Sequence, residues 1–152
     1  MHRPNSLQIT EARARGMTLV EVLVTLVIMS VGLLGVAALQ LTSLRNNYDA
    51  YVRSQASMLA ADLFDRMRAN RGEALAGDYS AALGPFTGTG AIWQADVGAW
   101  KRTLAAQLPN GDGSVQAEAF DAAGQVTAVR ITIQWNERGD NNPIVFTTLS
   151  GI

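Results

Sequence analysis

The feature that most constrains this chain is an uncharged stretch from Val22 to Leu39. A helix that crosses a bilayer needs roughly 20 predominantly apolar residues, and this stretch is close to that length. Any fold of the chain must therefore place one apolar helix near the N-terminus in a membrane.

Basic residues on the N-terminal side of this stretch predict its orientation. Arg13 and Arg15 lie just before it, and Arg3 lies further out. Lys and Arg are retained on the cytoplasmic side of a membrane span. We therefore expect a single-pass protein with its N-terminus inside and its C-terminus outside.

Glu21 is an unexpected residue at the start of the apolar stretch. A carboxylate inside a bilayer is disfavoured by roughly 2.5–3.5 kcal/mol on insertion scales and usually has a partner. Cleavage after Gly16 would place the new α-ammonium of Met17 about one helical turn from Glu21, where the charges would balance. The alternative is that Glu21 lies at the membrane edge and reaches the headgroups.

The sequence G-M-T-L-V-E at 16–21, followed by an apolar helix, resembles the processing site of type IV prepilins and type II secretion pseudopilins. The resemblance implies that 1–16 is a leader, which a prepilin peptidase removes by cutting between Gly16 and Met17. It also implies that Met17 is N-methylated, and that Glu21 pairs during assembly with an N-terminal amine, commonly a neighbour's. Met17 stands where the family most often has Phe.

An ordinary signal-peptidase site is the rival processing event. Gly35-Val36-Ala37 has the small-x-small pattern of such a site, and cleavage there would release a soluble domain. The apolar run, however, exceeds the ~7–15 residues of a typical signal peptide. This reading stays open as the minor alternative.

The helical pattern continues beyond the apolar stretch, and no proline occurs from Met17 to Asn70. We expect a helix of about 80 Å that ends at Asn70-Arg71-Gly72. A coiled coil is the alternative for so long a pattern, although 22–39 is apolar all round. We assign 17–44 to a membrane and filament-core helix and 45–152 to an exported domain. The apolar positions of the second half of the helix are Leu41, Leu44, Tyr48, Val52, Leu59, Leu63 and Met67.

Two further segments, V-G-L-L-G-V-A-A-L-Q at 31–40 and D-L-F-D-R-M-R-A-N-R at 62–71, resemble PilV-type minor pilins. This resemblance implies a structural subunit that helps to initiate type IV pili, with roles in twitching motility and attachment. The implied partners are other minor and major pilins, the prepilin peptidase and the inner-membrane assembly platform. The implied locations are the inner membrane before assembly and the pilus at the cell surface afterwards. A type II secretion pseudopilin is the alternative.

The rest of the chain predicts a connector, a short helix and a small sheet. The connector covers 72–98, and Val97, Trp100, Leu104 and Leu108 then indicate an amphipathic helix with Trp100 in the core. Alternating residues in 125–135 predict a strand with one buried face. The expected fold class is α+β and pilin-like, with a long helix packed on an antiparallel sheet. The expected strands are 114–120, 125–135 and 144–149.

Composition excludes several classes of function. Twelve basic and 13 acidic residues give a net charge of −1, so no nucleic acid is expected as a partner. Cysteine is absent, which excludes disulfides and thiolate metal sites. The single histidine, His2, lies in the expected leader, and the exported part has no Ser/His/Asp set or paired carboxylates. We therefore expect no enzyme, although a membrane-anchored or secreted enzyme is the alternative from another class.

Several short motifs point to turns and surfaces rather than to binding sites. Gly88-Thr89-Gly90 lacks the remaining residues of a nucleotide loop, and 138–140 spells Arg-Gly-Asp in an expected turn. Three aspartates, Asp112, Asp121 and Asp140, lack calcium-loop spacing. No metal or cofactor is expected. Arg66, Arg68 and Arg71 are expected to form a solvated helix end.

Overall fold

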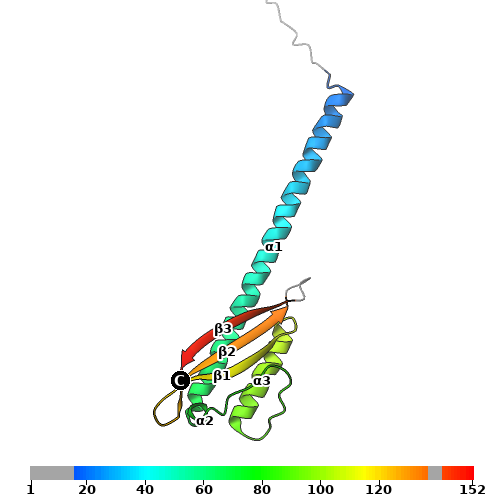
Figure 1. Cartoon of the computed structure of the whole chain (residues 1–152). Helices are drawn as coiled ribbons and strands as arrows, with labels where there is room; N and C mark the ends of the chain where they lie inside the picture. The colour runs from blue at the N-terminus through cyan, green and yellow to red at the C-terminus, as the bar shows by residue number, and fades with distance from the viewer. Residues whose placement is uncertain (1–15, 137–141) are drawn as a thin grey trace, which may run out of the picture. The chain divides into compact units, whose positions relative to one another are not determined.

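The structure is a computed structural model that describes residues 16–136 and 142–152. The chain divides into two compact units, Met1–Ser43 and Leu44–Ile152. The expected leader residues 1–15, with His2 and the three leader arginines, lie outside the described residues, as does the Arg-Gly-Asp sequence at 138–140. The described residues form one long helix, two shorter helices and a three-stranded sheet, arranged as in Figure 1.

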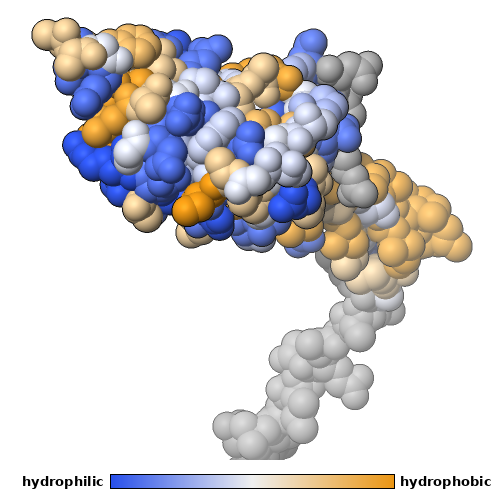
Figure 2. All heavy atoms as spheres, turned by 90° about the horizontal axis from the view of Figure 1, so that it is seen from below, coloured by the Kyte–Doolittle hydropathy of each residue, from blue (hydrophilic) through white to orange (hydrophobic). Residues whose placement is uncertain are grey.

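Helix α1 spans Leu19–Ala69, so it begins two residues later than expected and ends one residue earlier. By length and composition it is the one helix in the described residues that could cross a membrane. Figure 2 shows hydrophobic side chains gathered along its apolar part, whereas the visible face of the second unit is mostly hydrophilic. This distribution fits a helix that has lipid or other helices around it.

The sheet is an antiparallel meander in the order β1-β2-β3. Its strands are β1 (Asp112–Phe120), β2 (Val126–Asn136) and β3 (Pro143–Gly151), which confirms the three predicted strands with small shifts at their ends. A tight turn joins β1 to β2, where Asp121 N–H donates to Gln125 O at 2.9 Å and Gly124 has a φ of 78°. Glycine adopts this left-handed conformation without a steric penalty.

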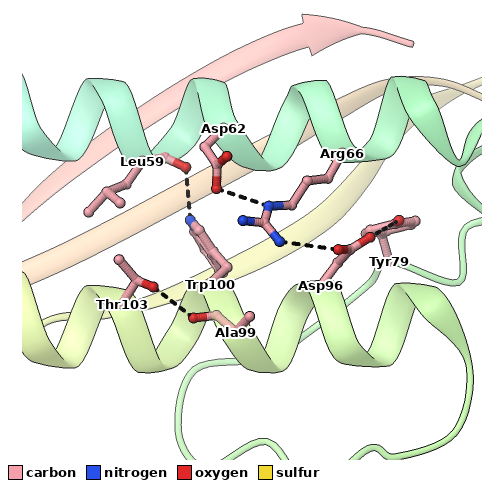
Figure 3. Close-up of polar contacts among 8 residues, drawn as sticks. All are labelled: Leu59, Asp62, Arg66, Tyr79, Asp96, Ala99, Trp100 and Thr103. Carbon is pink, nitrogen blue, oxygen red and sulfur yellow. Dashed lines mark hydrogen bonds and ion pairs between the residues drawn. The ribbon is translucent and has the colours of Figure 1, made fainter.

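The second unit has its core between one face of this sheet and two helices. Helix α3 (Ile92–Gln107) lies beside the last turns of α1 and runs antiparallel to it (Figure 3). The buried residues of β2 alternate as predicted, since Val129, Ile131, Ile133 and Trp135 are buried. The predicted α+β fold, a long helix packed on an antiparallel sheet, is confirmed.

The buried stripe of α1 differs from the expected one. Leu41, Leu44 and Tyr48 are exposed, because the stripe that packs in the second unit begins only at Val52. Two alanines and Phe64 belong to the stripe although the sequence pattern did not single them out. Small residues allow a close approach of the packed elements. The buried residues of α1 are Val52, Ala56, Leu59, Ala60, Leu63, Phe64 and Met67.

The expected connector contains more structure than predicted. A short helix, α2 (Arg71–Ala76), follows α1 almost directly and ends at Gly77, whose φ is 86°. Tyr79 and Ala81 are buried, and Ala81 forms an isolated antiparallel bridge with Val115 of β1. Helix α3 begins at Ile92, within the range assigned to the connector. The connector is thus held to the sheet by backbone hydrogen bonds at 2.8 and 3.0 Å.

Candidate processing and assembly site

The segment 16–18 precedes α1 and lies outside any helix or strand. Gly16 has no atom within 4 Å of a Cβ built on it, and Met17 is exposed. The Gly16–Met17 bond therefore lies in exposed backbone outside any helix. A protease can bind and cut a peptide bond in such a segment.

Thr18 begins the helix, a role that the sequence analysis missed. Its carbonyl accepts from Val22 N–H at 3.2 Å, and its hydroxyl accepts from Glu21 N–H at 3.2 Å. These two bonds are those of a helix N-cap, in which a Thr side chain satisfies one of the free N–H groups of the first turn. The spacing Thr-x-x-Glu is a sequence signature of such a start and could have predicted it.

Glu21 lies in the first turn of α1, where the positive end of the helix dipole favours an acidic side chain. Its carbonyl accepts from Thr25 Oγ1 at 2.6 Å. Among the residues described by the structure, no side chain forms an ion pair or hydrogen bond with the Glu21 carboxylate. The expected helical spacing between Met17 and Glu21 is absent, because Met17 precedes the helix.

Arg66 and Arg68 at the end of α1 form ion pairs with nearby carboxylates, whereas the sequence predicted a solvated helix end. Arg66 lies between Asp62 (3.0 Å) and Asp96 of α3 (3.3 Å), as Figure 3 shows. These carboxylates raise the pKa of the Arg66 guanidinium, chiefly through the hydrogen bond that Arg66 donates to Asp62. Arg68 pairs with Asp65 at 2.8 Å, donates to Ser150 Oγ at 3.0 Å and lies over the Phe64 ring.

Two polar clusters join the helices to the connector. Tyr79 Oη donates to Asp96 Oδ2 at 2.8 Å and accepts from Asn70 Nδ2 at 3.1 Å. Burial, together with the adjoining Asp96 carboxylate, raises the pKa of Tyr79 to about 12.

Trp100 lies in the core, where its Nε1–H donates to Leu59 O at 3.0 Å. Trp100 is 1% exposed, which confirms its predicted place.

The second cluster surrounds Lys101, whose ammonium donates to Ala82 O and Gly84 O, both at 2.6 Å, and to Asp112 Oδ1 at 3.1 Å. Asp112 Oδ2 accepts from Gly84 N–H at 2.6 Å. Burial opposes ionisation of this carboxyl, but its hydrogen bonds to Gly84, Gly113 and Lys101 prevail, so the pKa of Asp112 is lowered. Each of these groups has a structural partner.

The described residues contain no cluster of potential metal ligands. No group of three His, Asp or Glu side chains that could hold a metal occurs in 16–136 and 142–152. The chemical features that remain are an accessible Gly16–Met17 bond, a capped helix start and, before the apolar stretch, an acid without a partner in the part of the chain that the structure describes. Together with the α+β fold, they fit a pilin-like protein with a helix long enough to cross a membrane.

Comparisons with known proteins support a family assignment. The model of the prokaryotic N-terminal methylation motif matches residues 12–37, and the type IV pilin Tt1218 model matches residues 38–92. The chain is similar to the "Pilin-like protein PilA2" of Thermus thermophilus, with 29% identity over 141 residues that cover 84% of this chain and 72% of the relative. No solved structure matches the chain. These matches support a type IV pilin.

Type IV pilins are structural subunits that associate with other pilins and are processed by the prepilin peptidase at the N-terminal methylation motif. The motif and the long apolar helix fit a membrane-anchored pilin.

Proposed function

We propose that the chain is a minor pilin of the PilV type, which helps to initiate assembly of type IV pili and is incorporated into them. It acts in pilus biogenesis, twitching motility and attachment. The observation that carries the proposal is the Glu21 carboxylate, which lies in the first turn of α1 next to the uncharged stretch from Val22 to Leu39 and has no partner within the described residues. A partner from another subunit makes such an acid an assembly element.

The proposed maturation begins at the Gly16–Met17 bond. The prepilin peptidase removes residues 1–16 and N-methylates Met17, and residues 17–44 then anchor the chain as a single-pass, N-in and C-out protein of the inner membrane. The accessible backbone on both sides of the bond supports this step. Residues 45–152 form the exported domain, which reaches the cell surface with the pilus.

The proposed assembly step pairs Glu21 with the α-amine of Met17 in a neighbouring subunit. Thr18 caps the helix between these residues, so within one chain Met17 does not lie on the helical turn of Glu21. A charged pair between subunits compensates each charge in a medium of low dielectric constant, where an unpaired charge is costly. Other minor pilins, the major pilin and the inner-membrane assembly platform are the proposed partners.

Mass spectrometry of the mature chain tests the maturation step. In the native host, the N-terminus should be methylated Met17, and cells without the prepilin peptidase should retain residues 1–16. A start near Ala38 would contradict the proposal, since the apolar segment would then be a discarded signal.

Replacement of Glu21 tests the assembly step. Glu21→Gln preserves the shape but removes the charge, whereas Val22→Ala is a control that removes apolar atoms from the adjacent position. Loss of one member of a buried ion pair is worth roughly 3–5 kcal/mol, so incorporation of Glu21→Gln into sheared pili should fall by at least about tenfold. Both variants should still insert in the membrane. Normal incorporation of Glu21→Gln into pili would refute the proposed pairing. Incorporation of the natural chain only into a secretion filament would favour a pseudopilin.

A further inference from the structure

Strand β3 forms an open edge of the sheet. In the part of the chain that the structure describes, β3 pairs with β2 alone. Just beyond its end, Ile152 N–H donates to Thr127 O at 3.3 Å, which fixes the phase of this antiparallel pair. Backbone N–H and C=O groups point alternately to the two sides of a strand. The β3 residues whose groups point away from β2 are therefore Val145, Thr147 and Leu149.

The opposite edge of the same sheet, β1, carries features that hinder pairing with another chain. The connector covers part of it, because Ala81 forms a bridge with Val115. Its register with β2 shifts twice between Ala117 and Phe120, and Glu118 places a charge there. Covering segments, bulges and charged side chains are the usual means by which proteins protect an edge strand. The β1 edge is thus protected.

Strand β3 has none of these protections within the described residues. Its nine residue pairs with β2 follow one another without a shift in register. No side chain from 143 to 152 carries a charge. Pro143 cannot donate a hydrogen bond, but it stands at the very start of the strand, where proline is tolerated. A long, regular and uncharged edge is one to which a further strand can be added.

The core is also incompletely covered beside β3. Ile144 and Phe146 pack against the core but are only half-buried, whereas Ile131 and Ile133 of β2 are 0% exposed. Side chains on one face of neighbouring strands lie in contact. A strand beside β3 would therefore cover Ile144 and Phe146 with its own side chains. Apolar residues at alternate positions of that strand would extend the core.

We propose that β3 accepts an extended segment of a different protein subunit as a fourth, antiparallel strand of the sheet. The segment is uncharged and has apolar side chains at alternate positions, on the face that meets Ile144 and Phe146. Its backbone bonds to the free N–H and C=O groups of Val145, Thr147 and Leu149. Main-chain hydrogen bonds hold the segment, and the alternating side chains select it.

The direction of β3 disfavours a second copy of this chain as the occupant. Ser150, near the end of β3, accepts from Arg68, near the end of α1, so both elements run the same way in the second unit (Figure 1). Copies anchored in one membrane could therefore join these edges only with their β3 strands parallel. The two-fold axis would then place each free N–H opposite the same N–H of the other copy. This step rests on the proposed function, which gives both copies one orientation.

Amide hydrogen exchange of the natural full-length chain in detergent micelles tests the open edge. The probe is a synthetic peptide of alternating threonine and valine with a lysine at each end. At a peptide concentration about ten times its Kd, roughly one chain in eleven stays free, so exchange at Val145, Thr147 and Leu149 should slow about tenfold. The control is the same peptide N-methylated throughout, which has the same side chains but no backbone donor. It should leave exchange unchanged.

Pilus incorporation tests whether a partner subunit uses this edge. Thr147→Pro removes the central free N–H of the edge and leaves the hydrogen bonds to β2, a position at which an edge strand tolerates proline. Thr147→Val is the control, because it keeps the N–H and the shape of the side chain. At equal stability to urea, incorporation of Thr147→Pro into sheared pili should be at least about fivefold lower than that of Thr147→Val.

Three exchange results would overturn the inference: no slowing with the peptide, equal slowing with both peptides, or protection without peptide that grows with chain concentration. The last would assign the edge to a second copy. Equal incorporation of folded Thr147→Pro and Thr147→Val would refute its use in the pilus. A failure of the proposed function is distinguishable, since a chain that is not cleaved after Gly16 would refute that function while the peptide still protects the edge.

Discussion

Replacement of Lys101 by methionine should destabilise the second unit strongly. Lys101 lies in α3 and is 8% exposed, and its ammonium uses its three donors on Ala82 O, Gly84 O and Asp112 Oδ1. Methionine has a flexible, unbranched side chain that still fills space but donates no hydrogen bond. Lys101→Met therefore separates the contribution of the ammonium from that of the aliphatic stem.

The magnitude follows from the partners that Lys101 leaves behind. Removing one member of a buried ion pair costs roughly 3–5 kcal/mol, and a charged hydrogen bond contributes roughly 1.5–3 kcal/mol. The Asp112 side chain is 24% exposed and keeps the N–H groups of Gly84 (2.6 Å) and Gly113 (2.8 Å), so water and these donors offset part of the loss. We expect the free energy of unfolding to fall by about 3 kcal/mol.

The same cluster predicts a dependence on pH. The folded state lowers the pKa of Asp112, through the hydrogen bonds from Gly84, Gly113 and Lys101 against the effect of burial. Its stabilisation is therefore present above the pKa of the unfolded carboxyl, about 3.9, and is lost as the pH falls through the lower folded value. Lys101→Met should reduce this loss at acid pH, because it removes one of the causes of the lowered pKa.

Urea unfolding of the full-length chain in detergent micelles measures the effect. Trp100 and Trp135 are both buried, so tryptophan fluorescence reports loss of the core. Arg102→Met is the matched control, because Arg102 is the next residue of α3 and is exposed, and it should change stability by less than about 0.5 kcal/mol. Equal stability of the two variants would refute the reasoning from the Lys101 contacts.

Two further predictions concern Tyr79 and Thr18. The pKa of Tyr79 is raised to about 12 in the folded state, whereas an unfolded tyrosine ionises near pH ~10. The contribution of Tyr79 to stability should therefore be complete below pH ~10 and be lost as the pH rises through the folded pKa. Alkaline unfolding of Tyr79→Phe should lack that step. The outcome that contradicts this is an unchanged alkaline transition in Tyr79→Phe. Thr18→Val removes a helix cap worth roughly 0.5–2 kcal/mol, so amide hydrogen exchange at Glu21 in micelles should accelerate by about 2- to 30-fold, whereas Thr18→Ser should preserve protection. Equal exchange in both Thr18 variants would show that the hydroxyl does not cap the helix.

The sequence predicted best the elements whose signals are local. The uncharged stretch from Val22 to Leu39 indicates an apolar helix by its length alone, and alternation in β2 indicates which side chains are buried. Gly16, Met17 and Glu21 could be predicted as site residues because they lie within six residues of one another. The missed helix start at Thr18 was also local, since its capping signature was present in the sequence.

The sequence could not predict which face of α1 the sheet would cover. Both the buried stripe and an exposed stripe of α1 that includes Tyr48 have helical spacing and large apolar side chains, so periodicity does not distinguish Tyr48 from Val52. The choice between them depends on where β2 and α3 approach the helix. That approach is a property of packed elements far apart in the sequence, and Trp100 bonded to Leu59 O is one result of it.

The sequence by itself determined that this protein has a membrane-length helix, a cleavable-looking N-terminal motif and a small antiparallel sheet. These features depend on residues that are neighbours or are separated by one repeat of a helix or strand. Tertiary structure alone decided that Lys101 meets Asp112, that Tyr79 and Arg66 share Asp96, and that Met58 stays exposed beside buried Leu59. The physical reason is that such contacts arise only when distant segments compete for the same buried space, and a one-dimensional pattern carries no record of that competition.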